Sequence, residues 1–123
     1  MQLNLTATIL KTMVKGFAKV VSQRVTLPVL GYVLFRYQPD ESTISATVTN
    51  LEETLTYHLP PEAVIPGTGN PDAFLCPFSE LRNLAVNLSG RGTVLLTPEG
   101  ETGVIAGTRC GDSLVQREFE SMP

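Results

Sequence analysis

The order of predicted elements in this chain repeats once along its length. Alternation of apolar and polar residues predicts strands, and apolar residues spaced three to four apart predict helices. By these criteria a strand, a helix and three strands occupy residues 3–59, and the same order returns in residues 73–117. The repeat predicts a pseudo-two-fold α+β domain, with its two helices side by side on one face of antiparallel sheet.

The residues themselves repeat in part. Each half contains an apolar triplet, a proline followed by acidic residues, and a second apolar stretch, in that order. We expect the two proline segments to form turns between strands. The matching segments are Val33-Leu34-Phe35, Pro39-Asp40-Glu41 and Ile44-Ser45-Ala46 in the first half, and Val94-Leu95-Leu96, Pro98-Glu99 and Val104-Ile105-Ala106 in the second.

Strands are predicted wherever apolar residues alternate with polar ones. Residues 60–71, which hold four prolines, are predicted to be a connector between the halves. The predicted strands are 3–7, 32–37, 43–49, 53–59, 73–76, 94–97, 102–107 and 113–117.

The first predicted helix, Ile9 to Val21, has two different faces. Its apolar residues fall within one broad arc at about 100° per residue. Lys11, Lys15 and Lys19 fall within a narrow arc roughly opposite. Thr8 is the predicted N-cap, because a threonine hydroxyl can accept a hydrogen bond from an amide of the first turn.

The second predicted helix begins with Pro77 in its first turn and runs to about Leu88. Its apolar stripe predicts one buried face, and its small polar residues predict an exposed one. The predicted buried residues are Leu81, Leu84, Ala85 and Leu88, and the predicted exposed ones are Ser79, Asn83 and Asn87.

Positive charge is concentrated at the start of the chain. Residues 1–36 carry five basic side chains and no acidic one, whereas the rest carries four basic and twelve acidic ones. Like charges four residues apart on a helix oppose each other by about 0.2–0.5 kcal/mol per pair. Two interpretations of the lysine stripe stay open at this point, a solvated face and a contact for a polyanion. Lysines without interleaved aromatic residues favour phosphates over bases as the polyanion contact.

No group of residues in the sequence predicts catalysis. His58 is the only histidine, and we expect it to face solvent from a strand. Cys76 and Cys110 lie far apart and are expected to be reduced thiols, too few for a zinc site. Glu52 and Glu53 are adjacent, so on a strand they would point to opposite faces. We therefore expect a non-enzyme without metal or cofactor.

Length and composition bound the remaining possibilities. A chain of 123 residues with 42% hydrophobic and 17% charged residues is typical of one folded domain, here 1–123. No apolar run approaches the roughly 20 residues of a membrane span, and no export leader is evident. We expect a cytoplasmic protein that does not bind membranes.

Four segments, taken in order, resemble one family. They are Arg24-Val-Thr-Leu-Pro-Val-Leu-Gly31, Thr49-Asn-Leu-Glu52, Cys76-Pro77 and Glu118-Phe-Glu-Ser-Met-Pro123. They resemble the Arg-x-Thr-Leu-Pro-Ile-Leu-x, Thr-Asp-Leu-Glu, Val-Pro and Asp-Phe-Pro-x-Leu-Pro segments in the N-terminal domain of the bacterial sliding clamp, the β subunit of DNA polymerase III. The resemblance covers essentially the whole chain.

The resemblance implies a DNA-clamp (processivity-fold) domain, with two helices on the inner surface and sheet outside. In that family three such domains form a chain, and two chains close a ring around duplex DNA. It implies a non-enzymatic processivity factor that tethers a replicative DNA polymerase to duplex DNA through sequence-independent phosphate contacts. The implied partners are duplex DNA, a second copy in a ring, and, if further domains follow, the polymerase and a clamp loader.

The resemblance also assigns DNA-binding residues. Arg24 matches the family's DNA-contacting arginine in the loop after the first helix. Lys15 falls at a polar, inner-face position of that helix, and Lys11 and Lys19 extend the same face. Arg82, one turn into the second helix, would replace the basic residues that the family places just after its proline.

Two features depart from the family. The chain has the extent of the first of three domains, so we expect it to lack the family's peptide-binding pocket, which lies between the second and third. The family's last strand in this domain is rich in hydrophobic residues and joins neighbouring subunits, whereas Thr108–Leu114 is small and polar. The alternative interpretation is therefore a clamp-fold protein-interaction module that has lost ring closure and DNA encirclement.

Overall fold

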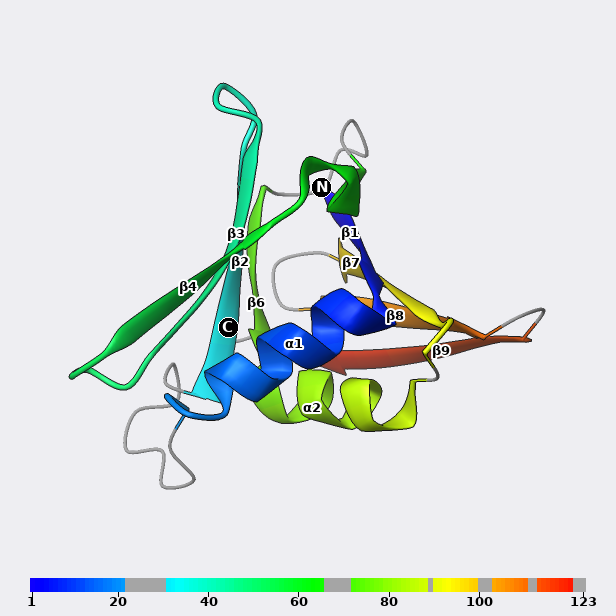
Figure 1. The fold of residues 1–123 in the computed structure, drawn as a ribbon. Coiled ribbons are helices and arrows are strands. Elements are labelled where there is room, and N and C mark those ends of the chain that lie inside the picture. Colours follow the sequence, from blue (N-terminus) through cyan, green and yellow to red (C-terminus); the bar gives the residue numbers. More distant parts are fainter. Residues whose placement is uncertain (22–30, 66–71, 89, 100–102, 111–112, 121–123) are drawn as a thin grey trace.

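The predicted repeat is present as two successive units of strand, helix and three strands (Figure 1). The computed structural model describes residues 1–21, 31–65, 72–88, 90–99, 103–110 and 113–120. The first unit is β1 Gln2–Thr6, α1 Ala7–Phe17, β2 Tyr32–Gln38, β3 Thr43–Thr49 and β4 Thr54–Leu59. The second is β6 Ala73–Pro77, α2 Phe78–Asn87, β7 Thr93–Glu99, β8 Gly103–Cys110 and β9 Ser113–Glu120.

The strands form two antiparallel sheets. The sequence predicted only that both helices pack on one face of antiparallel sheet. One sheet has the order β5-β1-β7-β8-β9, in which β5 is the short strand Val64–Ile65, and the other β4-β3-β2-β6. The first strand of each unit pairs with the second strand of the other unit, β1 with β7 and β6 with β2. This exchange interlocks the two halves, because neither sheet consists of strands from one half alone.

The pairing is symmetric at the level of single residues. Leu3 lies opposite Leu96 in one sheet, and Phe74 lies opposite Phe35 in the other. All four side chains are buried, and the rings of Phe35 and Phe74 stack with their centroids 5.2 Å apart. The repeat predicted from the sequence is therefore confirmed as a pseudo-two-fold axis that relates the halves.

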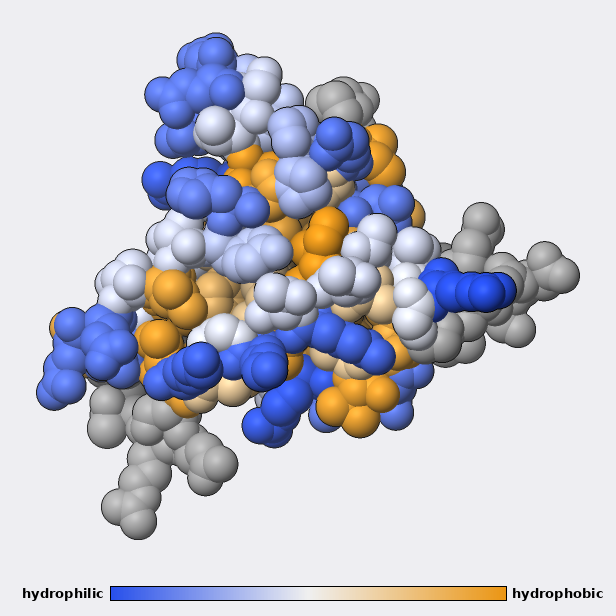
Figure 2. Space-filling model, viewed as in Figure 1, coloured by the Kyte–Doolittle hydropathy of each residue, from blue (hydrophilic) through white to orange (hydrophobic). Residues whose placement is uncertain are grey.

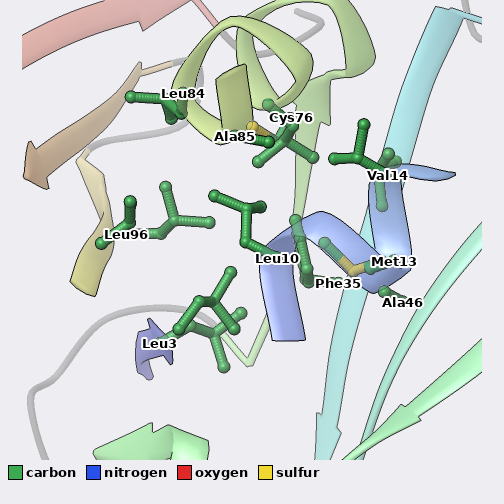
Figure 3. Packing of buried hydrophobic residues seen from close by; sticks show 14 of the residues in the cluster. Leu3, Leu10, Met13, Val14, Phe35, Ala46, Cys76, Leu84, Ala85 and Leu96 are labelled. Carbon is green, nitrogen blue, oxygen red and sulfur yellow. The ribbon is translucent and has the colours of Figure 1, made fainter. Parts of the chain in front are cut away.

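The hydrophobic core lies between the helix pair and the sheets (Figure 3). On β3, the alternating residues Ile44, Ala46 and Val48 are buried, whereas on the edge strand β4 only Leu59 is buried. Both predicted helix faces enter the core. Figure 3 labels Leu10, Met13 and Val14 from α1, Leu84 and Ala85 from α2, and strand residues that include Leu3, Phe35 and Leu96.

Two predictions about the connections were wrong. Pro98 lies within β7 opposite Val104 instead of in a turn. Because β1 pairs with β7 only as far as Leu96, β7 has a partner on one side at Pro98, which is where sheets tolerate proline. The connector also holds a 3₁₀ turn, Pro61–Ala63, and the strand β5, Val64–Ile65, which pairs with β1 but is too short to show alternation.

Within the described residues, neither helix has the length or the apolar character needed to cross a membrane.

Candidate nucleic-acid interface

Helix α1 starts two residues earlier than the sequence predicted. Its N-cap is Thr6, whose hydroxyl accepts a hydrogen bond from the Ile9 amide at 3.3 Å, and Thr8 lies exposed in the first turn. The shift arises because β1 runs directly into the helix. Thr6 is both the last residue of β1 and the N-cap of α1.

The three lysines lie together on the exposed side of this element. Lys11 and Lys15 are on α1, and Lys19 is in the turn that follows Phe17. The Val21 amide donates to the Phe17 carbonyl at 2.9 Å, a helical spacing, so the chain keeps winding past the assigned end of α1. The predicted stripe is therefore retained as one exposed row, visible as hydrophilic groups along α1 in Figure 2.

The acidic residues that the structure describes do not pair with the three lysines. Within the described part of the chain, no side-chain hydrogen bond or ion pair involves Lys11, Lys15 or Lys19. The acidic residue of α2, Glu80, is half-buried. The other described acidic residues whose burial is known lie in turns and connections, at Asp40, Glu41, Glu52, Glu53, Glu62 and Asp72.

Helix α2 follows β6 as directly as α1 follows β1. Pro77 is its N-cap, one position before the first turn in which the sequence placed it. Arg82 is exposed, and so are Ser79, Asn83 and Asn87, as predicted. The helices run side by side in opposite directions, so Arg82 belongs to the same layer as the lysines (Figure 1).

Some predicted features lie outside the described residues. Arg24 is among them, with the rest of its resembling segment up to Leu30, and so are residues 121–123. The segment Thr108–Leu114, which was compared with the family's last strand of this domain, covers the end of β8 and the start of β9. The role of Arg24 stays a prediction.

Comparison with known proteins gives matches at the level of structure. No protein-family model and no curated protein matches the sequence. A sliding clamp (DNA polymerase III subunit beta) from Pseudomonas aeruginosa bound to griselimycin matches 100% of this chain, with a TM-score of 0.71 and 23% identity. The corresponding clamp from Bartonella birtlesii matches with a TM-score of 0.74 and 18% identity. The beta subunit from DNA polymerase of Streptococcus pyogenes matches with a TM-score of 0.74 and 16% identity.

The chain has the fold of a sliding-clamp domain. It spans about 30% of the length of these clamp chains. The resemblance predicted from four short segments is thereby confirmed for the fold. At these identities the likeness shows the fold alone, and what the domain binds has to be argued from its own residues.

The clamp fold places the two helices in residue-by-residue correspondence. Residues 7–15 and the residues 71 positions later have the same degree of burial, whereas Gly16 is half-buried and its counterpart Asn87 is exposed. Lys11 corresponds to Arg82, so the pseudo-two-fold axis pairs a cation on one helix with a cation on the other. This correspondence was not predicted, because the residues that visibly repeat in the sequence lie in the strands.

The other side chains considered for catalysis or metal binding lie on or beside β4, or are buried. His58 is exposed on β4, as predicted. Glu52 and Glu53 lie in the turn before β4 instead of on the strand, because the Asn50 side chain accepts both of their amides at 2.9 and 2.7 Å. Within the described residues no group of histidine, cysteine and acidic side chains could hold a metal ion.

Cys76 is a free thiol that is fully buried on β6. Burial raises the pKa of this thiol, and the nearby Glu80 carboxylate raises it further. A thiol held in its protonated form is a poor nucleophile and a poor metal ligand. The prediction of a reduced cysteine is confirmed for Cys76, while the side chain of Cys110 lies outside the described residues.

Proposed function

We propose that this chain is one DNA-clamp domain, spanning residues 1–123, that acts in the cytoplasm as a non-enzymatic part of a sliding clamp. Its role would be to tether a replicative DNA polymerase to duplex DNA. The observation that carries the proposal is the row of Lys11, Lys15 and Lys19 on the helix layer of a clamp fold, exposed and without an acidic partner among the described residues.

The chemistry of the row suits a contact that slides. Lysine ammonium groups bind phosphate oxygens without reading sequence, and each neutralised phosphate releases counterions. About four such contacts, from the three lysines and Arg24 or Arg82, correspond to a slope near −3.6 of log affinity against log salt. Contacts of this kind hold DNA weakly at physiological salt, and a clamp requires that because it must move along the duplex.

The wider assembly belongs to the same proposal. A clamp acts as a closed ring, so the domain would work beside further clamp domains, from the same chain or from other copies. The polymerase and a clamp loader would then bind the assembled ring. The domain itself would supply the DNA-facing surface, with Arg24 and Arg82 extending the lysine row.

The test is binding of the 123-residue chain to a 20-base-pair duplex, followed by fluorescence anisotropy from low to physiological salt. Replacing Lys11, Lys15 and Lys19 together by glutamine should flatten the salt slope by about 2.7, and Lys15→Gln alone by about 0.9. Arg36→Gln is the matched control, since Arg36 is an exposed cation on β2, outside the helix layer.

Equal effects of Lys15→Gln and Arg36→Gln would contradict the proposed surface, because only net charge would then matter. Absence of binding by the natural chain at 20 mM salt would favour the alternative, a clamp-fold module that binds protein partners.

A further inference from the structure

The face of the four-stranded sheet that points away from the core carries cations but no carboxylate. Alternate residues point to this outer face, because their neighbours along the strands, such as Phe35 and Ala46, are buried on the other side. None of the outward residues is acidic, although the chain has twelve acidic residues. They are Tyr32, Leu34, Arg36 and Gln38 on β2, Thr43, Ser45, Thr47 and Thr49 on β3, Thr54, Thr56 and His58 on β4, and Ala73, Leu75 and Pro77 on β6.

Three of these side chains form one row across three strands, which we call the outer row. Arg36 on β2 lies directly opposite Ser45 on β3, and Ser45 lies directly opposite His58 on β4. Neighbouring strands are about 4.8 Å apart, so the backbones of Arg36 and His58 are separated by about 10 Å with Ser45 between them. The side chains on either side are long enough to reach the space above the Ser45 hydroxyl.

The outer row differs from the rest of this face because its donors are unused. The polar side chains on either side of it are hydrogen-bonded in pairs. These pairs are Thr43 with Gln38 at 3.2 Å, Thr47 with Thr56 at 3.1 Å and Thr54 with Thr49 at 3.2 Å. Within the described residues no hydrogen bond or ion pair involves a side chain of the outer row. Its guanidinium, hydroxyl and imidazole groups therefore face solvent.

The three donors of the outer row suit a phosphate group. A guanidinium is a planar fork that matches two phosphate oxygens, while a hydroxyl and an imidazole N–H can donate to the others. Exposed carboxylates border the face in the turns at the two ends of its strands, at Asp40 and Glu41 and at Glu52 and Glu53. They would repel a long polyanion such as duplex DNA, so the outer row suits one small anion.

An apolar block adjoins the outer row on the same face. It consists of two cross-strand pairs, Leu34 with Leu75 and Tyr32 with Pro77, and all four side chains are half-buried. Leu34 comes two residues before Arg36 on β2, a separation of about 6.8 Å along the strand. Small-molecule sites combine apolar contact area with a few polar groups that fix orientation. A nucleoside 5′-monophosphate carries its phosphate and its flat base at a comparable separation.

We propose that this outer face binds a nucleoside 5′-monophosphate, with the phosphate on the outer row and the base over the apolar block. The inference goes beyond the proposed function and does not rest on it, because the face points away from the core and the helix layer. Inorganic phosphate shares the anionic part of this ligand and lacks the base, so a comparison of the two separates the contributions.

The test uses His58 as a reporter. It is the only histidine of the chain, so its imidazole C–H protons give isolated signals in proton NMR. The natural chain is titrated at constant pH and ionic strength with adenosine 5′-monophosphate, with inorganic phosphate and with adenosine. The monophosphate should shift the His58 signals to saturation and should bind about tenfold more tightly than inorganic phosphate, because its base adds stacking contact. Adenosine should give no saturable shift.

Three variants locate the contacts. Arg36→Gln should weaken binding of the monophosphate about tenfold or more, because it removes charge-assisted hydrogen bonds. Arg91→Gln is the matched control and should leave the affinity unchanged, since Arg91 is an exposed cation in the turn before β7, outside the four-stranded sheet. Tyr32→Leu should weaken binding of the monophosphate and leave that of inorganic phosphate unchanged. Urea unfolding checks that each variant keeps the stability of the natural chain.

Equal losses in Arg36→Gln and Arg91→Gln would overturn the site, because only net charge would then matter. Equal affinities for the monophosphate and inorganic phosphate would overturn the assigned ligand. Absence of a saturable His58 shift with all three probes would overturn both. None of these results bears on the lysine row, whose binding to a duplex is measured separately by anisotropy.

Discussion

At the scale of single residues, the side chain of Cys76 shows how the fold changes chemistry. It lies on β6, opposite Val33 and fully buried, where ionisation of a thiol is strongly disfavoured. The carboxylate of Glu80, in the first turn of α2, adds repulsion to the cost of burial. Cys76, which the sequence predicted to be a reduced thiol, is therefore an ordinary core residue.

The raised pKa of Cys76 predicts how stability depends on pH. In the unfolded chain the thiol ionises near its ordinary pKa of about 9, whereas in the folded chain it stays protonated. Above that pH the unfolded state holds fewer protons, so the free energy of unfolding should fall as pH rises, by at most about 1.4 kcal/mol per unit. Urea unfolding of the natural chain and of Cys76→Ala between pH 8 and 10.5 measures this contribution.

Cys76→Ala should show the shallower decline above pH 9, since the other titrating groups are common to both proteins. Identical pH profiles would mean that Cys76 is not shielded from water as the structure has it.

At the scale of elements, the start of α1 depends on which threonine caps it. Thr6 and Thr8 both have a hydroxyl near the helix start, and the local sequence allows either of them to be the N-cap. The structure selects Thr6, because the pairing of β1 with β7 includes Thr6 opposite Thr93 and the chain turns into the helix immediately afterwards.

Replacing the two threonines separates these alternatives. Thr6→Ala should lower the free energy of unfolding by about 1 kcal/mol, because the Ile9 amide loses its acceptor. Thr8→Ala should change it by less than about 0.5 kcal/mol, as an exposed residue within the first turn does. Chemical denaturation of both variants measures the difference, and a larger loss for Thr8→Ala would place the cap where the sequence first indicated.

At the scale of the whole molecule, the interlocked sheets make the two halves dependent on each other. Each first strand lies in the other half's sheet, and both helices pack against one shared core. The halves therefore cannot unfold separately without breaking a sheet. We infer a single cooperative unit, even though the sequence reads as two similar halves.

Matched substitutions in the two helices test this cooperativity. Leu10 and Leu81 correspond under the pseudo-two-fold axis, and both are completely buried. Leu10→Ala and Leu81→Ala should each lower the free energy of unfolding by about 2–5 kcal/mol. Each should leave one transition that circular dichroism and tyrosine fluorescence report at the same denaturant concentration. Two separate transitions in either variant would show that the halves unfold independently.

Much of the fold was predictable because it depends on local periodicity. The spacing of apolar residues predicted both helices and most strands to within a few residues, as well as the repeat. The lysine row was predictable for the same reason, since residues four apart share a helix face in any context. Errors fell where periodicity gives no signal, at the two-residue strand β5 and at Pro98.

The sequence by itself determined the elements, their repeated order and the face of α1 that carries charge, because each depends on neighbours within a few residues. Only the tertiary structure decided that β1 pairs with β7 and β6 with β2, because those contacts join residues as far apart as Leu3 and Leu96. That exchange of strands sets α1 against α2. It brings Arg82 and Val86 into one layer with the lysines, through contacts between residues far apart in the chain.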